Sequence, residues 1–148
     1  MITASWPRLV IGTILLFVGA AEGYLAFALE NCAGSGTNSF VIPGLATWLL
    51  NAFAWLLLAR RVPSKLVLFV AALPALAALG YSYTTLQIAY GYVAAGKSAC
   101  ATITGDPSGP GGGGLLDILL WLLASASFWA GLAIVARRAI SIWKEREA

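Results

Sequence analysis

The chain has 148 residues, of which 60% are hydrophobic and only 10% are charged. Soluble domains carry roughly 25% charged residues, so this composition excludes an ordinary soluble protein and indicates a single integral membrane domain. The sequence contains no histidine, which excludes zinc or haem ligation by imidazole and Ser-His-Asp catalysis. The net charge of +3 does not indicate nucleic-acid binding, because the basic residues gather at predicted membrane boundaries.

Four apolar runs are long enough to cross a bilayer, which takes about 20 residues of α-helix. They cover roughly residues 9–29, 40–59, 66–90 and 115–136. Short connections favour antiparallel packing of consecutive helices. The predicted fold is therefore an all-α membrane protein with four transmembrane helices in an antiparallel bundle.

The first run carries an acidic residue, Glu22, with no other charge between Arg8 and Glu30. Insertion scales place the cost of a carboxylate near the centre of a spanning helix at about 2.5 to 3.5 kcal/mol, so such groups face protein or water. Gly19 and Gly23 flank Glu22 in a small-x-x-x-small pattern, which lets another helix approach closely. We therefore expect helix packing at Gly19 and Gly23, with Glu22 beside the contact.

Polar residues of the other runs are expected at a similar depth. No Lys or Arg lies inside any run, so Glu22 has no internal cation. Tyr83 and Gln87 share a helical face and predict the wall of a pocket with Glu22 near its base. The candidate intramembrane polar site comprises Glu22, Thr47, Tyr83, Thr84 and Gln87.

Three roles of Glu22 are open. A protonated or hydrogen-bonded Glu22 fixes helix packing, or Glu22 pairs with a basic residue of another subunit, or it exchanges a proton for a cation. The charge of the residue does not separate these roles.

Two cysteines lie in the connections that follow the first and third runs. Cys32 and Cys100 are expected on the same, outer side, where the redox compartment permits a disulfide. A bridge would close a loop of about 70 residues, worth about 4 kcal/mol in the chain-entropy model. The Gly- and Pro-rich sequence GDPSGPGGGG predicts a flexible outer loop over about 97–114.

Residues 91–98, GYVAAGKS, match the phosphate-binding pattern G-x-x-x-x-G-K-[ST]. That pattern binds phosphate when a strand delivers the turn to a helix N-terminus. Here an apolar helix precedes the match, so we do not interpret it as a nucleotide site.

The basic residues predict the orientation. Seven of the nine Lys and Arg residues flank one side and Arg146 follows them, while Lys97 falls on the other side. The seven are Arg8, Arg60, Arg61, Lys65, Arg137, Arg138 and Lys144. The positive-inside rule then predicts a multi-pass protein of the cell (inner) membrane with both termini in the cytoplasm.

The plan of four spans with one acidic residue in the first is similar to that of small multidrug transporters. The resemblance covers the architecture and Glu22 only, and the cysteine-bearing loops depart from it, so no family is assigned. The leading hypothesis is a non-enzymatic membrane subunit or interaction partner of a larger membrane assembly. It has no cofactor, and it contacts the lipid bilayer and another membrane subunit or a second copy of itself. The alternative is a small, dimeric, proton- or cation-coupled transporter that uses Glu22.

Overall fold

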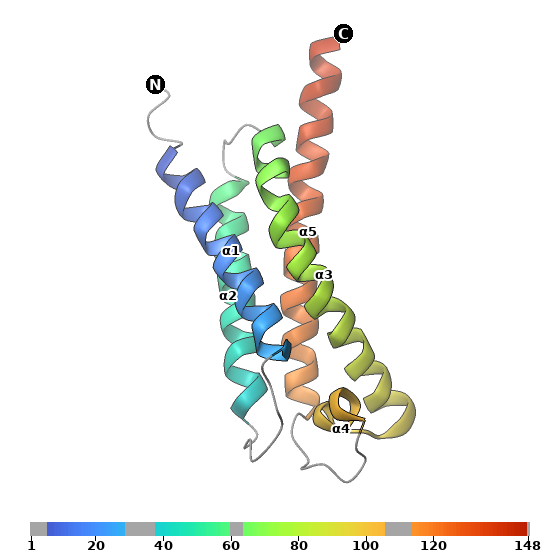
Figure 1. Cartoon of the computed structure of the whole chain (residues 1–148). Helices are drawn as coiled ribbons and strands as arrows, with labels where there is room; N and C mark the ends of the chain where they lie inside the picture. Colours follow the sequence, from blue (N-terminus) through green and yellow to red (C-terminus); the bar gives the residue numbers. More distant parts are fainter. Residues whose placement is uncertain (1–5, 29–37, 60–63, 106–113, 148) are drawn as a thin grey trace.

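The computed structural model describes residues 6–28, 38–59, 64–105 and 114–147. These residues form five α-helices (Figure 1): α1 (Trp6–Ala28), α2 (Asn38–Leu58), α3 (Ser64–Ala95), α4 (Ala99–Thr104) and α5 (Leu115–Glu147). All except the short α4 are long and apolar enough to cross a membrane. The chain is a multi-pass membrane protein, and the predicted all-α fold class with four long helices is confirmed.

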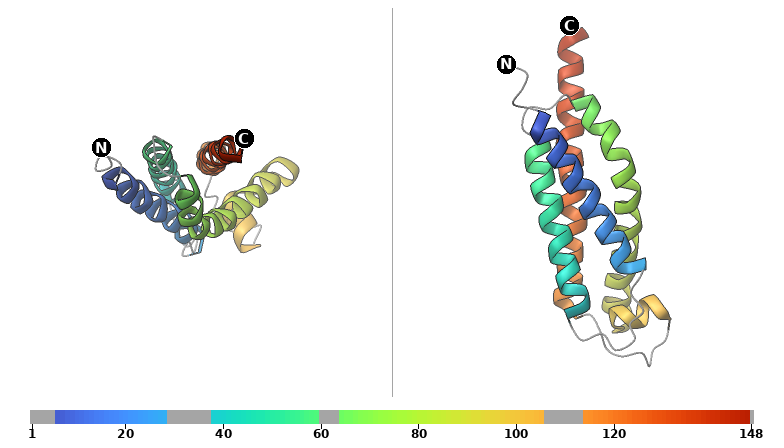
Figure 2. Two further views of the ribbon diagram at one scale, coloured as in Figure 1. Left: turned by 90° about the horizontal axis from the view of Figure 1, so that it is seen from above. Right: turned by 60° about the vertical axis from the view of Figure 1, so that its left-hand side comes forward.

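The four long helices form a ring. α1 and α3 run in one direction and α2 and α5 in the other (Figure 1). The pairs α1–α2, α2–α5, α5–α3 and α3–α1 are the closely packed neighbours (Figure 2). Among the long helices, α1–α2 and α3–α5 follow one another in the sequence and are antiparallel neighbours, as predicted.

α2 and α3 differ from that expectation, because they lie across the diagonal of the ring. In a bundle with neighbouring axes about 8–10 Å apart, the diagonal is about 14 Å. The connection 59–63 has five residues, which can span up to about 17 Å. A short connection is thus compatible with a diagonal crossing, and α2 gains α5 as a parallel neighbour.

Buried residues in the long helices follow alternating spacings of three and four. In α3 they are Val67, Ala71, Pro74, Ala78, Tyr81, Thr85 and Ile88. In α2 the same spacing joins Gly44, Thr47, Asn51, Ala54 and Leu58. A repeat of about 3.5 residues is the pattern of left-handed helical bundles. The outward faces are also apolar, since Phe69 and Val93 are more than four-fifths exposed, as expected for helices surrounded by lipid.

The two glycines predicted to pack helices both lie at helix contacts. A Cβ atom at Gly19 would lie 2.9 Å from Oδ1 of Asn51 in α2. A Cβ atom at Gly23 would lie 2.9 Å from Cδ1 of Tyr81 in α3 and 3.1 Å from Cγ2 of Thr47 in α2. The missing side chains let α1 approach both of its neighbours.

The two ends of the bundle differ. The end with α4 and the C-terminal ends of α1 and α3 is called here the α4 end. The opposite end carries Arg8, Arg137 and Arg138 and is called the basic end; α1 begins and α5 ends on this side (Figure 1).

The helix α4 corrects part of the predicted flexible loop over 97–114. Gly96 follows the end of α3 with a left-handed φ of 62°, and its N–H donates to the carbonyl of Tyr92 at 3.1 Å. Ser98 then caps α4, because its Oγ accepts from the N–H of Ala101 at 3.1 Å, and Gly105 (φ 74°) ends α4.

The capped, apolar ACATI sequence therefore forms a helix that packs on α3, whereas residues 106–113 lie outside the described residues. The GYVAAGKS match is the end of α3 and the cap of α4, with no preceding strand among the described residues.

Candidate functional site

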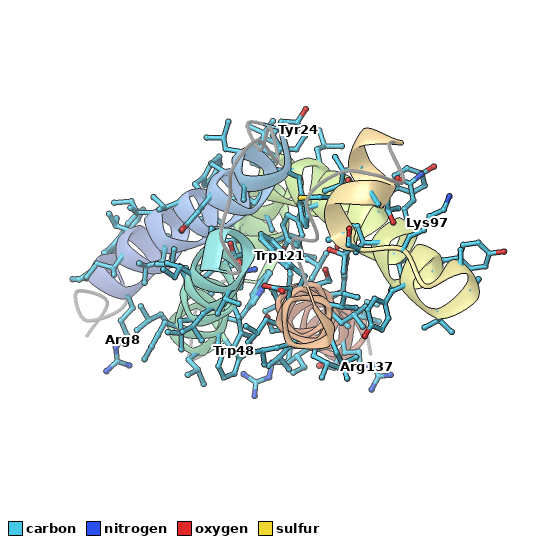
Figure 3. All side chains as sticks on the ribbon, turned by 90° about the horizontal axis from the view of Figure 1, so that it is seen from below. Arg8, Tyr24, Trp48, Lys97, Trp121 and Arg137 are labelled. Carbon is cyan, nitrogen blue, oxygen red and sulfur yellow. The ribbon has the colours of Figure 1, made fainter. Side chains whose placement is uncertain are left out.

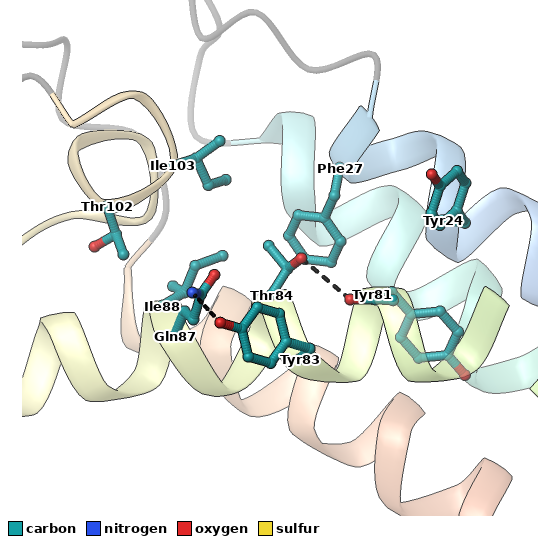
Figure 4. Close-up of a pocket in the computed structure, with 10 residues that line it drawn as sticks. Tyr24, Phe27, Tyr81, Tyr83, Thr84, Gln87, Ile88, Thr102 and Ile103 are labelled. Atoms are coloured by element: carbon teal, nitrogen blue, oxygen red, sulfur yellow. Dashed lines mark hydrogen bonds between the residues drawn. The ribbon is translucent and has the colours of Figure 1, made fainter. Parts of the chain in front are cut away.

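A pocket of about 440 Å³ opens at the α4 end between α1, α3 and α4 (Figure 4). It forms there because α3 continues past the end of α1, and α4 folds back beside α3 (Figure 2). The lining residues are Tyr24, Phe27, Gly80, Tyr81, Tyr83, Thr84, Gln87, Ile88, Thr102 and Ile103.

Three residues of the predicted polar site lie in this pocket, all on α3. Nε2 of Gln87 donates a hydrogen bond to the hydroxyl of Tyr83 at 2.9 Å. Oγ1 of Thr84 donates to the backbone carbonyl of Gly80 at 3.1 Å (Figure 4). Because Tyr83 accepts from Gln87, its own hydroxyl hydrogen stays available for an acceptor on a ligand.

Glu22 does not line this pocket. Gly19, three residues earlier, meets Leu50 and Asn51 of α2, whereas Tyr24 meets Gly80 of α3. Residues two apart on a helix point about 200° apart, so Glu22 and Tyr24 lie on opposite flanks of α1. Glu22 is partly exposed on the α2 side and makes no hydrogen bond or ion pair with another described residue.

Thr47 belongs to a second polar cluster in the bundle core. Thr47 and Asn51 lie one turn apart on α2 and are fully buried. Nδ2 of Asn51 donates to the hydroxyl of Tyr81 at 3.1 Å. Oγ1 of Thr47 and Oδ1 of Asn51 have no hydrogen-bond partner among the described residues. The structure therefore divides the five predicted residues among the pocket, the core and the outer flank of α1.

Sequence reasoning left out several pocket residues. Tyr81 connects the pocket and the core. It lines the pocket, and its hydroxyl accepts the hydrogen bond from Asn51 in the core. Its place in the three–four spacing of α3 is the signal that could have found it. Thr102 and Ile103 come from α4, which the Gly-rich composition of the connection concealed.

The lining determines what the pocket can hold. None of the described residues that line it carries a charge, and its aromatic and aliphatic walls bear hydroxyl and amide groups. Such a pocket suits a largely apolar molecule with a few hydrogen-bonding groups. Within the described ranges no group of three or more His, Cys, Asp or Glu residues could hold a metal ion. The expected lack of a cofactor stays a prediction.

The predicted disulfide involves α4. Cys100 is fully buried in the first turn of α4. Cys32 lies outside the described residues, so the pairing of Cys32 with Cys100 stays a prediction.

Comparison with known proteins finds no match to a family model, a curated protein or a solved structure. The fold itself defines the class, which is a multi-pass α-helical membrane protein with an aromatic pocket at one end. Its function is therefore inferred from the placement of its own residues.

Proposed function

We propose that the protein is a non-enzymatic membrane subunit that binds another membrane protein through the flank of α1 that carries Glu22. One observation supports this function most directly. Glu22 is partly exposed inside an apolar span and has no partner among the described residues. A carboxyl group placed in a bilayer at a cost of about 2.5 to 3.5 kcal/mol is stabilised when a donor or cation meets it. In this proposal the partner supplies the hydrogen-bond donor or cation that meets Glu22.

The depth of Glu22 defines where the partner group lies. Glu22 is five residues before Phe27, the end of the apolar span Trp6–Phe27. At 1.5 Å per residue, it lies about 8 Å inside the α4 end of the span. A Lys, Arg or other hydrogen-bond donor of the partner lies at this depth.

The surroundings of Glu22 suit a helical partner. Ile11, Leu15, Val18 and Glu22 follow one another at spacings of four, three and four, and all four are at least partly exposed. This is a second seam on α1, separate from the buried one, with the spacing of helix-to-helix contacts. A polar residue within an apolar seam can fix the register of such a contact.

Purification of the tagged chain from its native membrane in mild detergent tests this function. Mass spectrometry of the wild type is expected to find one stoichiometric partner. Glu22→Gln keeps size and hydrogen-bonding capacity but removes ionisation, so recovery of the partner falls while the variant folds normally. Gln87→Leu changes an exposed polar residue of α3, away from the Glu22 flank of α1, and as the control it leaves recovery unchanged.

A small transporter is the alternative function, and the aromatic pocket is the observation that favours it. In a transporter the titrating carboxyl is expected beside the substrate, whereas Glu22 does not line the pocket. A second copy would have to bring its own Glu22 to the site. A lone homodimer, with assembly unchanged but cation flux or resistance lost in Glu22→Gln, would replace the subunit function with transport.

A further inference from the structure

A second cavity, of about 520 Å³, lies between α2 and α5 toward the basic end. Small residues of both helices leave it open, namely Ala52 and Ala59 on one side and Ser127, Ala130 and Gly131 on the other. The indole of Trp55 packs directly on Gly131, where any side chain would collide with it. We call this cavity the α2–α5 groove.

Arg138 stands at the mouth of the groove. Its Nη1 donates to the backbone carbonyl of Ala59, which holds the guanidinium between α5 and the C-terminal end of α2. A guanidinium has five N–H donors in a planar fork, and most of them stay available for an anion. The adjacent Arg137 does not line the groove and projects outward from α5 (Figure 3).

The position of Arg138 matches the membrane boundary. The apolar span of α5 ends at Arg138, and that of α2 ends at Leu58, one residue before Ala59. We therefore expect the guanidinium at the level of phospholipid phosphates. From Ser127 to Arg138 the groove follows eleven residues of α5, about 16 Å. One leaflet of the hydrocarbon core is about 15 Å thick, so the groove has the length of one acyl chain.

We propose that the α2–α5 groove binds an anionic phospholipid, with one acyl chain along the small residues and the phosphate on Arg138. Basic pockets between membrane helices recognise such headgroups. The positive charge of Arg138 at the mouth of the groove favours a lipid with net negative charge over a zwitterionic one.

A second copy of the chain fits the groove less well than a lipid. Two copies in the same orientation would bring their Arg137 and Arg138 side chains together at one depth, where like charges repel. A flexible acyl chain fills the groove without adding a charge.

Native mass spectrometry of the delipidated protein in neutral detergent tests the site, with phosphatidylglycerol and phosphatidylcholine as probes. Wild type and Arg137→Gln are expected to bind phosphatidylglycerol about equally and to prefer it over phosphatidylcholine. Arg138→Gln makes the same charge change but removes the phosphate contact, so binding falls about tenfold or more. Ala130→Leu fills the groove and weakens both lipids, whereas Ala126→Leu, exposed on α5 outside the groove, does not.

Three outcomes would overturn the proposal. These are equal binding by Arg138→Gln and Arg137→Gln, equal affinity for the two lipids, or a dimer of the chain that Ala130→Leu breaks. Thermal unfolding of each variant without lipid shows whether its fold is intact. When a variant is folded, the number of lipid molecules bound in the mass spectrum measures lipid binding alone.

Discussion

At the scale of the residue, Asn51 and Tyr81 form the best-defined polar contact of the bundle core. Both side chains are buried, and the bond between them joins α2 to α3 across the diagonal of the ring. A polar pair within apolar helices specifies one rotation and one register, because every other arrangement leaves two groups unpaired. The bond therefore fixes how the diagonal helices face each other.

Replacement of Tyr81 by Phe is expected to lower the free energy of unfolding by about 0.6 kcal/mol, and by no more than about 1.7 kcal/mol. The ring still fills its space, but Nδ2 of Asn51 loses its acceptor. Tyr83→Phe is the control, since Tyr83 is exposed and its bond to Gln87 is on the surface, so we expect a change within about 0.5 kcal/mol. Unfolding in micelles followed by circular dichroism measures both, and equal effects would contradict a structural role for the buried pair.

At the scale of the element, α4 shows how two caps and a few apolar residues form a helix within a connection rich in Gly and Pro. Ser98 and Gly105 satisfy backbone groups at the two ends of a six-residue helix. Its buried face, which includes Ala99 and Cys100, packs with α3 and completes the pocket at Thr102 and Ile103. α4 is thus the element that turns a divergence of α1 and α3 into a pocket.

The predicted disulfide would attach α4 to the connection between α1 and α2. Digestion of protein prepared without reductant is expected to yield a linked peptide containing Cys32 and Cys100, and reduction is expected to lower the melting temperature. In the chain-entropy model, reduction of the bridge lowers the free energy of unfolding by about 4 kcal/mol. The double variant Cys32→Ser with Cys100→Ser is the control and should not respond to reductant. Alkylation of both thiols in untreated protein would show that no bridge exists.

At the scale of the whole molecule, the ring order decides which faces stay available. α1 packs against α2 and α3, so its remaining surface, with Glu22 at one margin, faces outward. α2 and α5 run parallel, which brings Ala59 beside Arg138 and forms the groove at the basic end. A ring in sequential order would have placed α3 rather than α5 beside α2.

The orientation in the membrane stays a prediction, with both termini in the cytoplasm of the cell. Because Cys100 is fully buried, a better probe is Lys97→Cys, at an exposed position of the α4 end, in a chain without Cys32 and Cys100. A membrane-impermeant thiol reagent should label this variant in intact cells. Ser141→Cys, exposed beyond the basic end, should react only after permeabilisation. The opposite pattern would invert the predicted topology and place the α2–α5 groove in the other leaflet.

The sequence by itself determined the membrane class, the approximate spans and the polar residues within them. Apolar length and charge distribution are local properties of a segment, so they are readable without the fold. Gly19 and Gly23 were found in the same way, because a small-x-x-x-small pattern defines a face within a single helix.

Only the tertiary structure decided which of these residues meet. Depth placed Glu22, Thr47 and Tyr83 together, but the rotation of each helix separates them, with Thr47 in the core, Tyr83 in the pocket and Glu22 on the flank. The rotation of each helix about its axis is fixed by the packing of the buried faces of all four helices together. The apolar faces toward lipid and toward protein are alike in composition, so no single helix reveals it.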